Sequence, residues 1–340
     1  MVWLKIIKMD GYHYNHQYRD GLNVLKEKFN DNPEESCCSG GFYFTNAKYI
    51  FKYLGYGNYV GVIYLPESRS GFKLVEDITG DRWRANMIIL DERYDLSDVN
   101  TFKFLVDKFD ADISVDNYYA LIWAATAGYI DIVKFLVENG ADVSVAKDLA
   151  LRRAAKRGHY EIVKYLVKNG ANVSADNDCA LIWAAKRGHL KIVEYLVGKG
   201  ANIHSGHDAA FRLSAENGHL PVVKYLFKCC KPLVDKKTGT EIRHSLSEGC
   251  CQSRCSGVNV HSFNDYALRW SVLNGYLSVV KYLVEKCDAD IDADDDCALN
   301  WSARYNHPAI FKYLVKKGAN IDSSKFVRDY NDRIMILDKS

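Results

Sequence analysis

The sequence lacks the features that mark membrane proteins and several common enzyme motifs. Its 340 residues contain no run of about eighteen apolar side chains, and the first residues carry no cleavage site of small residues. It has no Gly-rich phosphate loop ending in Lys-Ser or Lys-Thr, no Gly-x-Ser-x-Gly turn and no His-Glu-x-x-His helix. We therefore expect a cytoplasmic protein without a membrane partner, a cofactor or a catalytic residue.

The sequence also lacks an excess of either charge. It has 45 basic and 43 acidic side chains, which gives a formal net charge of +2. Such a balance produces no overall field toward nucleic acid, so we expect no nucleic-acid partner, and any electrostatic attraction has to be local. Cysteine usage is modest, at ten residues, and Cys179 and Cys297 recur at one position of a repeat. This pattern favours reduced thiols in the cytosol.

A repeat of thirty residues fills most of the chain. Full copies start at about residues 117, 147, 177, 207, 264 and 295, and a half copy covers residues 98–113. Each full copy predicts two helices joined by Gly followed by His or Tyr, because Gly accepts the left-handed conformation of a tight turn. One copy cannot bury both of its helices, so neighbouring copies must stack.

Three positions in the first helix of each copy have predicted roles. A pair of small residues, such as Ala184 and Ala185, lets neighbouring helices approach closely. An Asp stands before the first helix, where its carboxylate is expected to cap the amino terminus; the five are Asp148, Asp178, Asp208, Asp265 and Asp296. A Trp directly before the small pair is predicted to pack in the core rather than to bind a partner; the four are Trp123, Trp183, Trp270 and Trp301.

These copies resemble the ankyrin repeat, in which a first helix ending in Gly-His precedes an Ile-Val-x-x-Leu helix and a Gly-Ala-Asp/Asn-Val turn. The resemblance covers residues 98 to about 322. It implies an α-solenoid of paired antiparallel helices, acting as a monomeric, non-catalytic scaffold that binds a partner protein through its concave face. The Thr-Pro-Leu-His opening of the family is absent and the period is three residues short, so we expect shorter hairpin tips. Asp-capped copies of this length are similar to ankyrin proteins of giant, mimivirus-like DNA viruses, which implies the host cytoplasm.

The repeat pattern divides the chain into three predicted parts. Residues 1–93 form a small N-terminal α+β domain, with strands near residues 40–45, 58–66 and 85–90 and a helix near 46–54. Residues 94–322 form the solenoid, with an insertion at 231–262, and residues 323–340 form a C-terminal capping segment. The Gly40–Thr45 strand and the Asp81-Arg82-Trp83 turn resemble the leader domain found ahead of such viral arrays.

The two positions directly before the Gly turn vary between copies, and we take them as candidate partner-binding positions. Two arginines in the first helix of the second copy are added to them. The second and third copies are basic there, and the candidates are Arg152, Arg153, Lys156, Arg157, Lys186 and Arg187. They form either a docking patch for a protein with an acidic surface or a solvated helix face, and both interpretations stay open.

Two chemical alternatives depend on single segments. The Gly40–Thr45 strand also looks like a segment of ADP-ribosyltransferases, which would make His13 or His16 a cofactor contact and Glu92 the catalytic carboxylate. A folded capping or docking module is the interpretation that we favour. Thiols and imidazoles in and beside the insertion could in number hold zinc, but no Cys-x-x-Cys pair occurs, so no metal is predicted; they are Cys229, Cys230, Cys250, Cys251, Cys255, His244 and His261.

Overall fold

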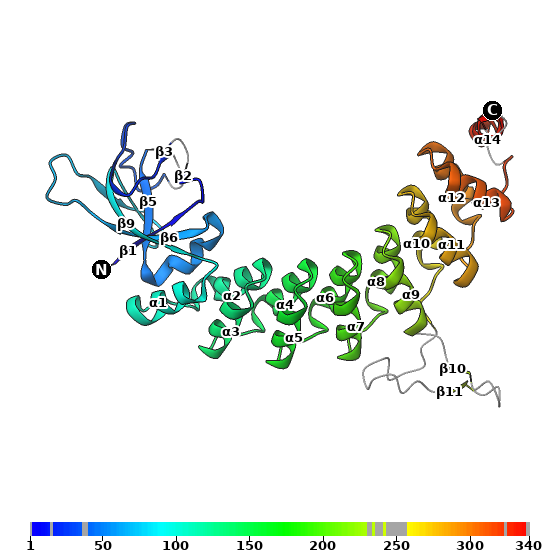
Figure 1. The fold of residues 1–340 in the computed structure, drawn as a ribbon, viewed down its shortest axis with the longest axis horizontal. Helices are drawn as coiled ribbons and strands as arrows, with labels where there is room; N and C mark the ends of the chain where they lie inside the picture. The colour runs from blue at the N-terminus through cyan, green and yellow to red at the C-terminus, as the bar shows by residue number, and fades with distance from the viewer. Residues whose placement is uncertain are drawn as a thin grey trace. The chain divides into compact units, whose positions relative to one another are not determined.

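The computed structural model describes residues 2–13, 16–35, 40–229, 233–234, 241–242, 257–322 and 325–337. They divide into two compact units, Met1–Ala150 and Leu151–Ser340, and each unit is described by itself. Figure 1 labels the helices and strands, and among the helices described none is long and apolar enough to span a membrane.

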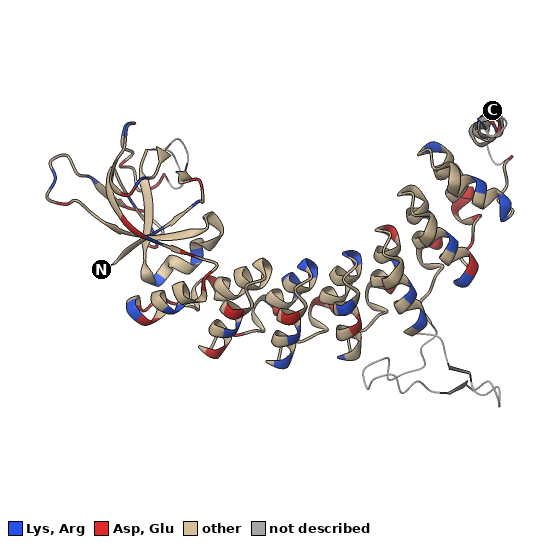
Figure 2. Cartoon of the chain, in the orientation of Figure 1, with Lys and Arg blue, Asp and Glu red and all other residues tan. Residues whose placement is uncertain are grey.

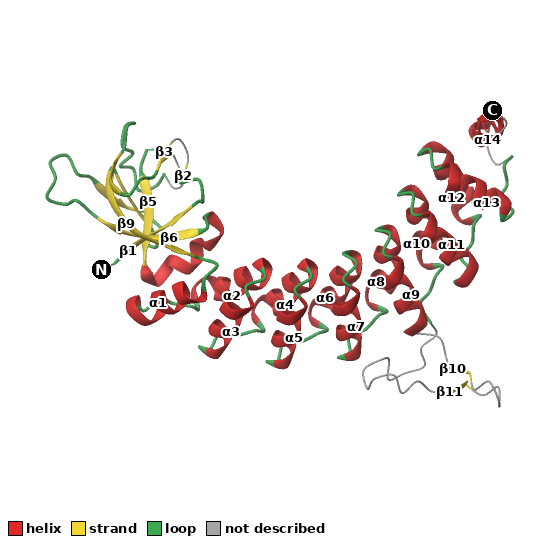
Figure 3. Cartoon of the chain, viewed as in Figure 1, coloured by secondary structure: helices red, strands yellow, loops and turns green. Residues whose placement is uncertain are grey.

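The first unit contains an antiparallel sheet of seven strands (Figure 3), in the order β4-β9-β6-β1-β5-β8-β7. Its strands are β1 (Trp3–Ile7), β4 (Gly21–Val24), β5 (Phe42–Asn46), β6 (Tyr59–Tyr64), β7 (Leu74–Glu76), β8 (Trp83–Ala85) and β9 (Met87–Asp95). A short hairpin of β2 (Tyr12–His13) and β3 (His16–Gln17) is separate from this sheet. The start of β9 alternates between half-buried and buried side chains, as a strand with one face on a core requires.

One face of this sheet carries a single buried cluster that includes Ile7, Phe42, Ile63 and Leu90, and Leu4 and Val60 are buried on the other face. A 3-10 helix, η1 (Ala47–Tyr56), follows β5 close to the range expected for a helix, and it contacts β1 and β5. The fold class is therefore confirmed for this part: a strand-rich domain with one short helix, ahead of a helical array.

The helices that follow the sheet in the first unit are α1 (Val99–Phe109), α2 (Val115–Ala127) and α3 (Ile130–Glu138). The side chain of Asp98 caps α1 by accepting a hydrogen bond from the backbone N–H of Asn100. Helix η1 packs on these helices, and the ring of Phe51 stacks on that of Phe102 with centroids 5.2 Å apart. The strand-rich domain and the first helices thus share buried aromatic contacts.

The second unit is an array of paired helices. The first helices of the copies are the end of α4 (Val145–Arg157), α6 (Ala175–Lys186), α8 (Ser205–Glu216), α10 (Ser262–Leu273) and α12 (Ala293–Arg304). The second helices are α5 (Tyr160–Lys168), α7 (Leu190–Gly198), α9 (Leu220–Cys229), α11 (Leu277–Lys286) and α13 (Pro308–Lys316), and α14 (Lys325–Leu337) packs on α12. First helices contact first helices along the array, and second helices contact second helices.

Each copy places the same side chains in the core. In the third copy, Ala184 and Ala185 of α6 and Ile192, Val193 and Leu196 of α7 are all buried. The small pair and the amphipathic stripe therefore act as the sequence predicts. Within the insertion, the described residues are 257–262 and the strands β10 (Leu233–Val234) and β11 (Glu241–Ile242), which pair antiparallel.

A left-handed turn of three residues begins the first helix of each copy. In α6 the φ angles of Asp176, Asn177 and Asp178 are 55°, 57° and 56°. Non-glycine residues rarely adopt this conformation because their Cβ approaches the following carbonyl oxygen, which costs roughly 1–2 kcal/mol per residue. Contacts of the turn with the rest of the array must offset that cost.

Candidate protein-binding surface

Buried aspartates join successive copies, and this corrects one of the predicted roles. The carboxylate of Asp178 accepts hydrogen bonds from the backbone N–H of Asn202, at 2.8 Å, in the turn after α7, and from the hydroxyl of Ser205, at the start of α8. Asp208 accepts from the backbone N–H of Asn259, and Asp265 from that of Asp290. The prediction that these three carboxylates cap their own helices was wrong, because they accept hydrogen bonds from the segment that leads into the next first helix.

Arginines close the left-handed turns. Arg212 donates from Nε to the carbonyl of His207 at 2.8 Å and from Nη2 to that of Gly206 at 2.9 Å. Arg269 donates in the same way to the carbonyls of Asn264 and Phe263, both in the left-handed turn at the start of α10. The guanidinium fork matches two carbonyl groups whose orientation the turn fixes, so it offsets part of the strain.

A second set of contacts fixes the Gly turns at the ends of the first helices. The ring of His219 lies over Gly188, and its Nε2 lies 3.0 Å from the carbonyl oxygen of Lys186. A Cβ atom at Gly188 would come within 2.5 Å of that ring. His307 repeats the contact on Gly275, and Tyr276 takes the same place over Gly218. The imidazoles at this turn therefore have structural contacts.

The predicted basic candidates lie on the first helices of the second and third copies, where Figure 2 shows Lys and Arg at the ends of α4 and α6. Arg153, Arg157 and Arg187 are exposed. Lys156 and Lys186 are half-buried, and both ammonium groups approach the ring of Trp183, with Nζ at 3.9 Å and 5.6 Å from the centroid. Such cation–π contacts hold the two charges at a fixed place.

Arg152, the sixth candidate, is held by an ion pair within the array. Its Nη1 lies 2.7 Å from the carboxylate of Asp176 in the next copy, and its side chain is only 16% exposed. Arg269 forms the equivalent pair with Asp294. Because the pair neutralises its charge, Arg152 contributes less than the other five candidates to any attraction for an acidic partner.

The tryptophans are not core residues, contrary to the sequence-based expectation. Trp123, Trp183, Trp270 and Trp301 are all half-buried, and each presents part of its ring on the surface of a first helix. The rings of Trp270 and Trp301 meet edge to face, with centroids 5.7 Å apart. The two residues that follow each Trp are buried in the contact between helices, so the preceding position turns outward.

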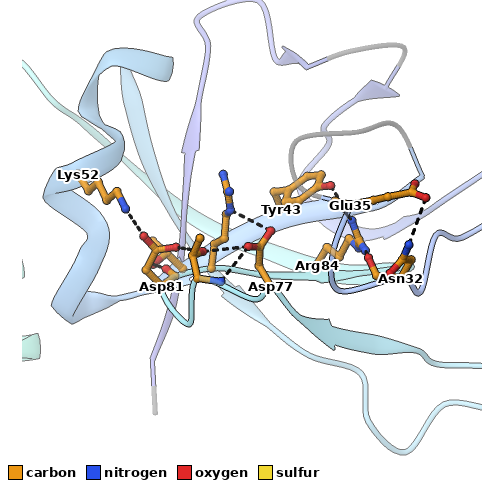
Figure 4. Close-up of polar contacts among 10 residues, drawn as sticks. Asn32, Glu35, Tyr43, Lys52, Asp77, Asp81 and Arg84 are labelled. Atoms are coloured by element: carbon orange, nitrogen blue, oxygen red, sulfur yellow. Dashed lines mark hydrogen bonds and ion pairs between the residues drawn. The ribbon is translucent and has the colours of Figure 1, made fainter.

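The strand-rich domain contains a network of buried polar groups (Figure 4). Asp81 is buried and pairs with Lys52, and Thr79 donates to it at 2.6 Å. Burial opposes ionisation of Asp81, but the hydrogen bonds from Lys52 and Thr79 outweigh it and hold the pKa of this carboxyl below its ordinary value. Asp77 pairs with Arg82 in the same turn, so the network holds β7 and β8 together.

Arg84 forms the other half of this network. Its guanidinium donates to the hydroxyl of Tyr43 at 2.9 Å and to the backbone carbonyls of Asn32 and Glu35. Hydrogen bonds from Asn30 and Asn32 lower the pKa of the Glu35 carboxyl. These contacts fasten the loop before β5 to the sheet and require no ligand.

The residues named for the transferase alternative also have structural contacts. His16 lies 3.3 Å from the side-chain oxygen of Asn23 and packs against the ring of Phe42. Glu92 is exposed on β9 and accepts a hydrogen bond from the hydroxyl of Tyr94. The side chain of His13 lies outside the described residues. Structure and comparisons offer nothing that favours an ADP-ribosyltransferase.

Most of the residues considered as zinc ligands lie outside the described part of the chain; they are Cys230, Cys250, Cys251, Cys255 and His244. His261 is described, and its Nδ1 lies 3.0 Å from the Asp265 carboxylate. Among the described residues, no group of three or more His, Cys, Asp and Glu side chains is placed to hold a metal ion.

Comparison with known proteins agrees with this architecture. Profiles of ankyrin repeats match residues 145–207 and 213–325, and a second ankyrin profile matches residues 121–167. The chain therefore belongs to the ankyrin repeat family. Members of this family are generally scaffolds for protein–protein interactions, and they are typically not enzymes.

The relatives point to a viral group within this family. The ankyrin repeat protein R868 of Acanthamoeba polyphaga mimivirus is 41% identical over 138 residues, which cover 41% of this chain and 67% of that protein. Protein R896 of the same virus is 44% identical over 137 residues, which cover 40% of this chain and only 41% of that protein. The resemblance to mimivirus ankyrin proteins is thereby confirmed. The human ASB11 ankyrin repeat domain is 22% identical, with a TM-score of 0.45, over 59% of this chain and 84% of that domain.

Proposed function

We propose that the chain is a non-catalytic adaptor whose first-helix face, the concave face in this family, binds the acidic surface of a partner protein. The contact surface is the basic patch, which we define as Arg153, Lys156, Arg157, Lys186 and Arg187. The observation that carries the proposal is the placement of two ammonium groups on Trp183, flanked by three exposed arginines.

The chemistry of the basic patch suits recognition of carboxylates. Arginines can bind a carboxylate with two parallel hydrogen bonds, and tryptophan and arginine are common among residues that dominate the energy of an interface. The half-buried ring of Trp183 adds apolar area between the charges. An acidic partner would gain electrostatic steering from the cations and burial of area from the ring.

The test is affinity purification from the native cell with the full chain as bait. Reversal of charge at Lys156, Arg157, Lys186 and Arg187 to Glu is expected to abolish capture of the principal partner. The matched control reverses four lysines of the second helices, namely Lys164, Lys168, Lys224 and Lys228, and should leave capture intact. Unchanged capture by the first variant would remove the basic patch from the proposal.

We assign no reaction to the strand-rich domain. The proposal rests on the structural contacts of His16 with Phe42 and of Glu92 with Tyr94, which leave neither residue facing a catalytic partner. Calorimetric titration of NAD into the full chain is expected to give no binding heat. A saturable heat at micromolar NAD would instead support the transferase alternative.

A further inference from the structure

The second helices of the second unit carry a large local charge that the composition conceals. Residues 160–168, 190–199, 220–229, 277–286 and 308–317 contain eleven lysines and three glutamates, and all fourteen side chains are exposed. The surplus of eight positive charges stands against a formal net charge of +2 for the whole chain. Figure 2 shows basic residues along α9, α11 and α13.

Four of these lysines form a regular row, which we call the lysine row. Lys164, Lys224, Lys281 and Lys312 occupy the same position, directly before a Tyr, in α5, α9, α11 and α13. In α7 the position holds Glu194, which interrupts the row. Since second helices pack side by side along the array, one lysine per copy becomes a line of ammonium groups.

Contacts between copies hold part of this row in place. Nζ of Lys224 lies 5.6 Å from the ring centroid of Tyr282 in the next copy, and Nζ of Lys281 lies 5.7 Å from that of Tyr313. Cation–π attraction of this kind restrains an exposed ammonium group beside the ring. The ammonium groups therefore extend toward the following copy.

The chemistry of this face indicates which polyanion it fits. It contains no arginine, so it offers point charges to phosphates and lacks the planar fork that reads the edge of guanine. None of the large exposed apolar side chains among the described residues lies on these five helices, so nothing is available to anchor the face in a lipid interface. The same cation recurs on α5, α9, α11 and α13, and such a row matches a polymer with recurring identical anions better than an irregular acidic protein surface.

We infer that the lysine row binds the phosphate backbone of nucleic acid without sequence preference. This inference goes beyond the adaptor function and does not depend on it, because the basic patch lies on the first helices and the lysine row on the second. The expectation that no nucleic acid binds was based on net charge, which averages the acidic turns with the basic helices.

The test is fluorescence anisotropy of the full chain with a labelled DNA duplex of about 30 base pairs, measured between about 50 and 200 mM salt. Four phosphate contacts predict a slope of about −3.6 for log Kobs against log salt, which is an affinity loss of about 150-fold over this range. The substitution Glu194→Lys completes the row, so the loss should grow to about 500-fold, with tighter binding at low salt.

Removal of the row should abolish this behaviour. The variant with Lys164, Lys224, Lys281 and Lys312 replaced by Gln is expected to bind weakly at low salt and to show a slope near zero. The matched variant replaces Lys156, Arg157, Lys186 and Arg187 by Gln, which removes the same charge from the first helices and should preserve both affinity and slope. Far-UV circular dichroism checks that both variants keep their helices.

Three outcomes would overturn the inference. Equal losses in both variants would mean that the duplex senses only total charge. Failure of the wild-type chain to bind the duplex at about 50 mM salt would exclude nucleic acid. Binding of phosphatidylserine vesicles or polyglutamate that depends on the row, when the duplex does not bind, would assign the row to a membrane or to an acidic polypeptide.

Discussion

The bridge made by Asp178 gives the sharpest test of how the copies are joined. Its buried carboxylate accepts two hydrogen bonds from the segment that leads into the next first helix, from the N–H of Asn202 and the hydroxyl of Ser205. The substitution Asp178→Ala removes both acceptors without touching the apolar core. Asp178→Asn keeps one acceptor oxygen for the same N–H and provides a partial rescue.

The magnitude follows from the partners of the carboxylate. Hydrogen bonds to a charged group are worth about 1.5–3 kcal/mol each, and removing the carboxylate also relieves the cost of burying a charge, so the net loss is about 2 kcal/mol. Asp176→Ala is the matched control two residues away. It breaks the ion pair with Arg152, in which the Asp176 side chain is 39% exposed, and should cost less than about 1 kcal/mol.

Hydrogen exchange at the amide of Asn202 is the appropriate assay, because repeat arrays can open locally. A loss of about 2 kcal/mol corresponds to exchange roughly 30-fold faster in Asp178→Ala. Asp178→Asn should lie between the wild type and Asp178→Ala. If Asp176→Ala accelerates exchange at Asn202 as much as Asp178→Ala does, the bridge does not hold the copies together.

Further predictions concern the turns of the same array. Gly188→Ala should lower the free energy of unfolding by about 2 kcal/mol or more, as urea titration would show, because φ is +76° and the new Cβ meets the His219 ring; the loss should shrink in a His219→Ala background. Lys147→Gly, at φ 58°, should raise the free energy of unfolding by about 0.5–1 kcal/mol, whereas Asn177→Val should lower it. Burial, followed by the charges of His189 and Arg187, lowers the pKa of His219 below its ordinary value of 6.5, and the hydrogen bond to the Lys186 carbonyl only partly opposes this. Its stabilising contribution is therefore complete above that value and is lost as pH falls toward the folded pKa, so the urea midpoint should decline below about pH 6.5 and His219→Tyr should weaken the decline.

The array could be predicted from the sequence, and the sheet only in part. Each position of the thirty-residue repeat occurs in six copies. Buried positions such as Ala184 and Ile192 can therefore be recognised because similar apolar residues recur there. The strand-rich domain has no repeat, so each of its positions occurs only once in the sequence. Its strand β4 is only four residues long, and its β7 three, and such short segments carry too little alternation to be recognised before pairing is known.

The roles of Asp178 and Trp183 could not be predicted because both depend on backbone direction. A carboxylate before a helix usually caps that helix. Three consecutive left-handed residues instead place the Asp178 carboxylate where it accepts a hydrogen bond from the N–H of Asn202. A Trp beside buried alanines reads as core by hydropathy, yet the close approach of first helices leaves no room for an indole between them. Helix propensity and hydropathy describe a residue by itself, whereas the packing of neighbouring copies determines which side of a helix is buried.

The candidate surfaces illustrate a related limit of sequence comparison within one chain. Residues that differ between copies, such as Arg153 and Arg187, attract attention because a binding surface has to be specific. Residues that recur, such as Lys224 and Lys281, are easily dismissed as part of the repeat. Stacking, however, brings the recurring lysines of α5, α9, α11 and α13 into one row, interrupted by Glu194 of α7, so recurrence itself creates a surface. Surface positions that vary between copies therefore indicate a partner with a particular shape, and surface positions that hold the same residue in successive copies indicate a partner that is itself periodic.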